Sequence, residues 1–117
     1  MEIKEQILSI KQIKELEKLG FDVNKHSSLK SNGEQIIIKD DFYIGGAPLF
    51  PMMTIGDIIS VLPVIIKEEY FLSVNSEYCT YSMIEGLDTI FYTWEKEPIN
   101  NLFKTLVWCI KNKYITL

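Results

Sequence analysis

The chain has 117 residues and a mass of 13.6 kDa, which is the size of one domain. Hydrophobic residues make up 47% of it and charged residues 24%, so the composition is that of a globular protein and excludes a disordered or fibrous chain. The net charge is −4, and all 12 cationic residues are lysine. This combination argues against general attraction to nucleic acid and against sites that need the planar fork of arginine.

Charge is distributed unevenly along the chain. Residues 1–20 carry four lysines and four glutamates, whereas residues 68–97 carry seven acidic residues against Lys96 alone. Residues 98–117 carry three lysines and no acidic residue. The acidic segment favours a basic partner, or a surface that imitates nucleic acid.

The sequence indicates a reduced, cytoplasmic protein with no membrane association. The N-terminus alternates charges and lacks the apolar run of a signal peptide. The longest apolar stretch, residues 55–66, is 12 residues long and is interrupted by Asp57 and Pro63, so it is too short to span a bilayer. Cys79 and Cys109 form no CxxC motif and do not indicate a disulfide scaffold.

The first half of the chain predicts a helix, a loop and a short β ribbon. Apolar side chains recur at helical spacing over residues 2–19, and Gly20 supplies a stop. The polar segment 24–33 is typical of a loop. Residues 35–39 and 42–44 predict two short strands that pair with each other.

The second half predicts a helix, three strands and a final helix. Thr54 is an N-cap candidate with Asp57 as its capping-box partner, and Pro63 ends that helix. Pro98 begins the last helix. Between the two helices, strands are expected at about residues 69–75, 78–84 and 88–95.

These elements predict an α+β fold in a single domain, residues 1–117. Its α-β-β-β-α core, residues 54–115, is expected to be a three-stranded antiparallel sheet packed against helices. The N-terminal amphipathic helix, within residues 1–20, and the short ribbon precede that core.

Period-two alternation divides the side chains of the three strands between two faces. The more apolar set is expected to face the helices and comprises Tyr70, Leu72, Val74, Cys79, Tyr81, Met83, Ile90, Tyr92 and Trp94. The other set is rich in hydroxyl groups and comprises Phe71, Ser73, Tyr78, Thr80, Ser82, Thr89, Phe91 and Thr93. Rigid aromatic rings among hydroxyl groups are typical of a protein-binding surface. Alternatively, the first 50 residues cover this face.

Partner-binding residues are therefore expected on that face and beside it. Trp108 lies on the polar side of the last helix, where it either anchors a partner or closes the edge of the core. The expected aromatic anchors are Phe71, Tyr78, Phe91 and Trp108, and the expected charges are Glu68, Glu69, Glu85 and Glu95.

Catalytic, metal and cofactor sites are not indicated by the sequence. His26 is the single histidine and lies in a polar segment, where adjacent Ser27 does not have the geometry of a nucleophile–base pair. Cys79 and Cys109 fall near expected buried faces, where cysteine behaves as a small apolar residue. We therefore expect neither an enzyme nor a bound cofactor or metal, with a small cysteine enzyme as a remaining alternative.

The element order of residues 54–114 is also that of a double-stranded-RNA-binding domain. That family resemblance implies a lysine cluster at the start of the last helix, which would hold phosphates across a groove. Here that position reads Glu95-Lys96-Glu97-Pro98-Ile99-Asn100-Asn101. Nucleic-acid binding is therefore an alternative that lacks its principal contacts.

Two segments, Thr54-Ile-Gly-Asp-Ile-Ile-Ser-Val-Leu-Pro63 and residues 97–115, flank short tyrosine-rich strands. Together they resemble small uncharacterised accessory proteins of bacteriophages and prophages of AT-rich hosts, over about half of the chain. The resemblance implies an accessory role, such as blocking a host defence protein. We accordingly expect a non-catalytic protein-binding module with a host protein as partner. A nucleic-acid-binding or nucleic-acid-mimicking regulator, and a homo-oligomer that buries the same aromatic residues, are the alternatives.

Overall fold

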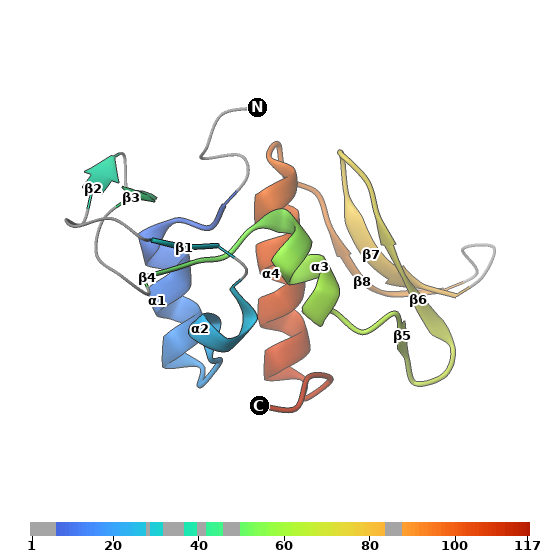
Figure 1. Cartoon of the computed structure of the whole chain (residues 1–117). Coiled ribbons are helices and arrows are strands. Elements are labelled where there is room, and N and C mark those ends of the chain that lie inside the picture. The colour runs from blue at the N-terminus through green and yellow to red at the C-terminus, as the bar shows by residue number, and fades with distance from the viewer. Residues whose placement is uncertain (1–6, 28, 32–36, 40–41, 46–49, 84–87) are drawn as a thin grey trace.

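The computed structural model describes residues 7–27, 29–31, 37–39, 42–45, 50–83 and 88–117 (Figure 1). Within them the chain has the predicted α+β class, with helices against one face of an antiparallel sheet. The sheet has four strands instead of the expected three.

The N-terminal helix α1 (Ile10–Lys18) begins later than the apolar pattern predicts, because Ser9 caps it. The Ser9 hydroxyl accepts a hydrogen bond from the Gln12 N–H at 3.2 Å, and the Gln12 side-chain carbonyl accepts one from the Ser9 N–H at 2.9 Å. The preceding backbone is extended, and the Leu8 N–H donates to the Met53 carbonyl at 2.9 Å. A capping box thus ends the extended segment and starts the helix.

Two short antiparallel ribbons lie near α1. They are β1 (Leu29–Ser31) with β4 (Phe50–Met52), and β2 (Ile37–Lys39) with β3 (Phe42–Gly45). The second pair confirms the predicted ribbon. The first pair, together with α2 (Val23–His26), occupies much of segment 24–33, so the prediction of a loop there is wrong in part.

Helix α3 (Ile55–Val61) has the capping box that the sequence predicts. The Thr54 hydroxyl accepts from the Asp57 N–H at 3.1 Å, and the Asp57 carboxylate accepts from the Thr54 N–H at 2.9 Å. Pro63 follows the last turn, where it cannot continue the helical hydrogen bonds.

The main sheet contains four antiparallel strands in the order β5-β6-β7-β8. They are β5 (Ile65–Ile66), β6 (Tyr70–Val74), β7 (Cys79–Ser82) and β8 (Thr89–Thr93). The sequence pattern does not predict β5, because this strand has only two residues and no glycine marks either of its ends. Lys67 and Glu68 make the turn into β6 with φ values of 54° and 62°, a conformation uncommon for residues other than glycine.

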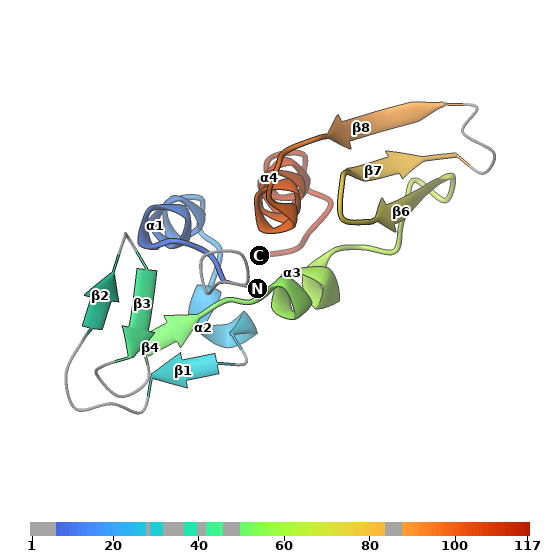
Figure 2. The ribbon, with the colours of Figure 1, turned by 90° about the horizontal axis from the view of Figure 1, so that it is seen from above.

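The last helix, α4 (Pro98–Lys111), lies between the sheet and the N-terminal elements (Figure 2). The Gln12 side-chain amide donates to the Asn100 side-chain carbonyl at 2.8 Å and ties the first turn of α1 to that of α4. The side chains at the centre of the core are fully buried and include Leu8, Leu16, Met53, Ile58, Tyr81, Leu102, Leu106 and Cys109. One side of α4 therefore packs on the sheet, and the other faces α1.

Candidate interaction surface

A β-bulge near the start of β8 decides which side chains the sheet presents to solvent. Ser82 pairs with Thr89, but Tyr81 pairs with Phe91, so Ile90 is an extra residue on β8. A bulge shifts the alternation of side chains by one residue from that point onward.

The predicted faces of β8 are consequently exchanged beyond the bulge. Phe91 was expected on the outer face but lies on the helix face, where its ring stacks on Trp108 with centroids 4.6 Å apart. Thr93 is buried on the same side. Tyr92 was expected towards the helices but is 59% exposed opposite Thr80.

Trp108 lies at the edge of the core. Its ring also approaches Tyr81, with centroids 5.8 Å apart, and Tyr114, at 5.2 Å. The side chain is half-buried by these rings and by Phe91. Trp108 and Phe91 therefore join the sheet to α4 within the chain.

The outer face of the sheet carries the most exposed aromatic residues among those described. Trp94 is 72% exposed, Tyr92 59% and Phe71 39%. Tyr78 is half-buried and stacks on Tyr92 with ring centroids 5.8 Å apart. We call Phe71, Tyr78, Tyr92 and Trp94 the aromatic face.

The described N-terminal elements do not cover the aromatic face. Figures 1 and 2 show α1, α2 and the two short ribbons on the far side of α4 from the sheet. The alternative that the first 50 residues cover this face is therefore wrong for the part of them that the structure describes.

A chain of hydroxyl groups lies between the aromatic rings. Thr89 donates to the Ser82 hydroxyl at 3.2 Å, Ser82 and Thr80 share a hydrogen bond of 2.9 Å, and Thr80 donates to the Phe91 carbonyl at 2.8 Å. Since the Thr80 proton is used on the carbonyl, Ser82 donates to Thr80, and all three donors point the same way along the sheet. These bonds fix the side-chain rotamers before any partner arrives.

Acidic side chains border the aromatic face. Exposed carboxylates lie on the turns of the sheet at Glu68, Glu69 and Glu77, whereas the Asp88 carboxylate accepts a hydrogen bond from the hydroxyl of the buried Tyr70 at 2.8 Å. Glu95 is half-buried and forms an ion pair with Lys104 of α4. Glu85, the remaining expected charge, lies outside the described residues.

Strand β8 is an outermost strand of the sheet. One of its two edges pairs with β7, and the other pairs with no described strand. The Asn75 N–H donates to the Tyr78 carbonyl at 3.0 Å, and bonded pairs alternate along an antiparallel ladder. Cys79 and Tyr81 therefore turn their backbone groups towards β8, and Tyr92, opposite Thr80, turns its own N–H and C=O to the open edge. Such an edge accepts a further strand.

The two thiols lie inside the core. Cys79 and Cys109 are both fully buried and free. The Cys109 thiol donates to the Tyr81 hydroxyl at 3.6 Å, and that hydroxyl donates to the Pro63 carbonyl at 2.8 Å. Burial raises the pKa of Cys109 to about 11 and also raises the pKa values of Cys79 and Tyr81. Both thiols are therefore protonated at neutral pH.

His26 differs from the solvated loop residue that the sequence predicts. It ends α2, is half-buried and stacks on Phe21 with ring centroids 4.9 Å apart. The described residues hold no group of three His, Cys, Asp or Glu side chains placed to bind a metal ion. In the same part of the chain, no helix has the length and apolar character needed to cross a bilayer.

The sequence pattern places Phe71 and Tyr78 on the outer face of the sheet, as the structure does, but assigns Tyr92 and Trp94 to the helix face. The cause is the bulge at Ile90, because no glycine in β8 indicates a bulge there in the sequence. The expected strand 88–95 included Trp94, which lies one residue beyond the end of β8, so the same shift moved it to the wrong face.

Comparison of the chain with protein-family models, with curated protein sequences and with solved structures finds no match.

Proposed function

We propose that this protein is a non-catalytic, protein-binding accessory module, encoded by a phage or another mobile element and acting in the cytoplasm of its host. It binds a basic host protein through the aromatic face and blocks it, as an inhibitor of a defence component would. The single observation that carries the proposal is the exposure of Tyr92 and Trp94, at 59% and 72%, on a sheet whose turns carry exposed carboxylates.

The chemistry of the aromatic face supports a protein as its partner. A few hot-spot residues supply most of the binding energy in protein interfaces and are enriched in tyrosine and tryptophan, and truncation of such an anchor costs about 2 kcal/mol or more. Hydroxyl groups already held by the Thr89–Ser82–Thr80 chain lose little conformational freedom on binding. The surface thus combines rigid rings with fixed polar groups.

Charge selects a basic partner over a second copy of the chain. A symmetric dimer through the aromatic face would bring two borders of glutamates together, and like charges in apposition disfavour association. A basic surface would gain from the same carboxylates and would approach faster at low salt. Light scattering tests the oligomer, and we expect a monomer.

The experiment compares capture from host lysate by the native protein and by two charge variants. Glu68→Gln/Glu69→Gln removes two exposed carboxylates beside the sheet, and Glu17→Gln/Asp22→Asn removes two from the N-terminal elements as a matched control. We expect the first variant to lose the captured protein and the control to retain it. Equal retention by both variants contradicts the proposal.

The acidic border also supports a second form of the proposal, in which the protein imitates nucleic acid. The observation that favours it is the run of seven acidic residues against one lysine over residues 68–97. Adding duplex DNA to the captured complex distinguishes the two forms. Release by DNA assigns the partner's nucleic-acid-binding surface as the target, whereas DNA-resistant capture assigns another basic surface.

A further inference from the structure

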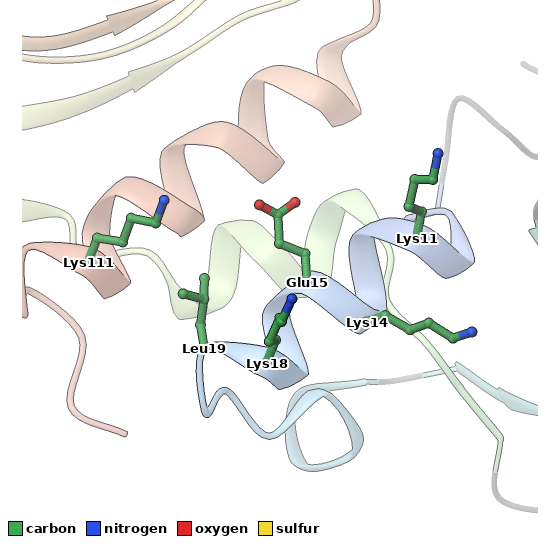
Figure 3. Close-up of a pocket in the computed structure, with 6 residues that line it drawn as sticks. All are labelled: Lys11, Lys14, Glu15, Lys18, Leu19 and Lys111. Carbon is green, nitrogen blue, oxygen red and sulfur yellow. The ribbon is translucent and has the colours of Figure 1, made fainter.

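A lysine-lined groove lies between α1 and the end of α4 (Figure 3). It has a volume of about 440 Å³ and is lined by Lys11, Lys14, Glu15, Lys18, Leu19 and Lys111. We call it the α1–α4 groove. Figure 3 shows Lys111 reaching from α4 towards α1, with Lys18 and Glu15 on the facing helix.

The groove continues past the ends of the two helices. A second hollow of about 480 Å³ shares Leu19 and Lys111 with it and adds Ile110, Lys113 and Ile115. Apolar side chains thus form the continuation of the groove, and lysines stand along its rim. A ligand that fits both hollows must be amphipathic.

The lysines of the groove are not neutralised by the described residues. The single ion pair in that part of the chain joins Lys104 to Glu95, and neither residue lines the groove. Glu15 is the one carboxylate among the lining residues. A net positive site therefore persists on a protein whose total charge is −4.

Helix dipoles account for some of these lysines but not for all. Lys18 and Lys111 lie in the last turns of α1 and α4, where a positive charge is favourable. Lys11 lies in the first turn of α1, where a positive charge is unfavourable, and Lys14 lies in the middle. Lys11, Lys14 and Lys18 share one helical face at the spacing i, i+3 and i+7, which a helix with acidic residues at the same spacing matches.

We infer that the α1–α4 groove binds an acidic amphipathic helix of a protein, at a site separate from the aromatic face. Carboxylates of the bound helix would pair with the lysines of the rim, and its apolar side chains would pack on Leu19, Ile110 and Ile115. Nucleic acid fits less well, because no aromatic ring among the lining residues can stack a base and no arginine can hold a phosphate with two bonds. The protein would then present surfaces of opposite charge on the two sides of α4 and would bridge two partners.

The test uses a fluorescein-labelled synthetic helix of leucine and glutamate, with a second peptide in which every glutamate is replaced by glutamine. Binding is measured by fluorescence anisotropy at low and at physiological salt. Lys18→Gln/Lys111→Gln removes one lysine from each wall of the groove. Lys25→Gln/Lys96→Gln removes two exposed lysines elsewhere and is the matched control. Circular dichroism verifies that both variants are folded.

We expect the acidic peptide to bind the native protein, the glutamine peptide to fail, and the groove variant to bind about three- to tenfold more weakly than the control variant. Equal weakening by both variants would mean attraction to charge in general and would overturn the inference, as would no binding of the acidic peptide. Displacement of the peptide by a single-stranded oligonucleotide at lower concentration than by unlabelled peptide would assign the groove to nucleic acid and overturn it too. A Tyr92→Ala/Trp94→Ala variant should bind the peptide normally. Binding to the groove is thus tested separately from the function proposed for the aromatic face.

Discussion

Phe91 stacks on Trp108 with ring centroids 4.6 Å apart, and this contact fixes β8 with Phe91 towards α4 and Tyr92 towards solvent. The bulge at Ile90 makes the contact, because without it Tyr81 would pair with Ile90 and the faces of β8 would be exchanged. The position of the candidate binding residues therefore depends on an intramolecular aromatic pair.

The first prediction concerns that pair. Phe91→Ala and Trp108→Ala should each lower the free energy of unfolding by about 2–3 kcal/mol, because each removes a half-buried ring from the junction of sheet and helix. A double-mutant cycle in urea should give a coupling of about 1 kcal/mol between the two rings. Additive effects of the two substitutions would mean that the rings do not interact.

The second prediction separates binding from stability. Tyr92→Ala/Trp94→Ala should abolish capture of the partner and change the free energy of unfolding by less than about 1 kcal/mol, because both side chains are mostly exposed. Ile59→Ala/Val64→Ala, which truncates two other exposed apolar residues, should leave capture intact. Loss of capture by the control variant as well would mean that capture does not depend on the aromatic face.

The helices and strands could be predicted from the sequence where the residues that determine them are close neighbours in the chain. The capping box at Thr54 and Asp57 and the proline at the start of α4 lie beside the turns that they determine, and both helices begin where the sequence places them. The start of α1 carries an equivalent signal in Ser9 and Gln12, but the apolar pattern before it masks that signal, since Ile7 is buried in extended chain.

The faces of the sheet were predictable on β7 but not beyond the bulge of β8. Cys79 and Tyr81 lie on the helix face as expected and are fully buried, although Thr80 on the outer face is also buried, at 7% exposed. The extra residue at Ile90 turns Phe91 towards Trp108, and this ring contact joins positions far apart in sequence. Local pattern carries no information on that contact, so two of the exposed aromatic residues, Tyr92 and Trp94, were assigned to the core.

The third prediction concerns the start of α1. Ser9→Ala should lower the free energy of unfolding by about 1 kcal/mol, since it removes the hydroxyl that caps the helix. Ser9→Thr keeps a hydroxyl and should lose much less. Thermal or urea unfolding followed by circular dichroism measures both variants, and equal stability of Ser9→Ala and native protein would place the start of the helix elsewhere.

The fourth prediction concerns pH. The pKa of Cys109 is raised by burial to about 11 from an ordinary 9.0, so the folded state disfavours the thiolate more than the unfolded state does. Its contribution to stability is therefore fully present below pH 9 and is lost as the pH rises from 9 towards 11. Urea titrations across this range should show a shallower loss of stability for Cys109→Ala than for the native protein.

Thiol labelling gives an independent check on the same residues. At pH 8, both thiols of the native protein should react with a disulfide reagent far more slowly than those of the urea-unfolded chain, because Cys79 and Cys109 are fully buried and protonated. Labelling of the folded protein as fast as the unfolded chain would contradict the described core and would revive a cysteine enzyme as an alternative.

Photo-crosslinking from single positions tests whether the aromatic face binds a basic protein. A benzophenone amino acid is placed at Trp94 in one variant and at Ile59, on α3, in a matched control, and each is irradiated in host cells. We predict one dominant crosslinked protein of high isoelectric point from position 94 and none from position 59. The same crosslinks from both positions, or an acidic partner from position 94, would contradict the account.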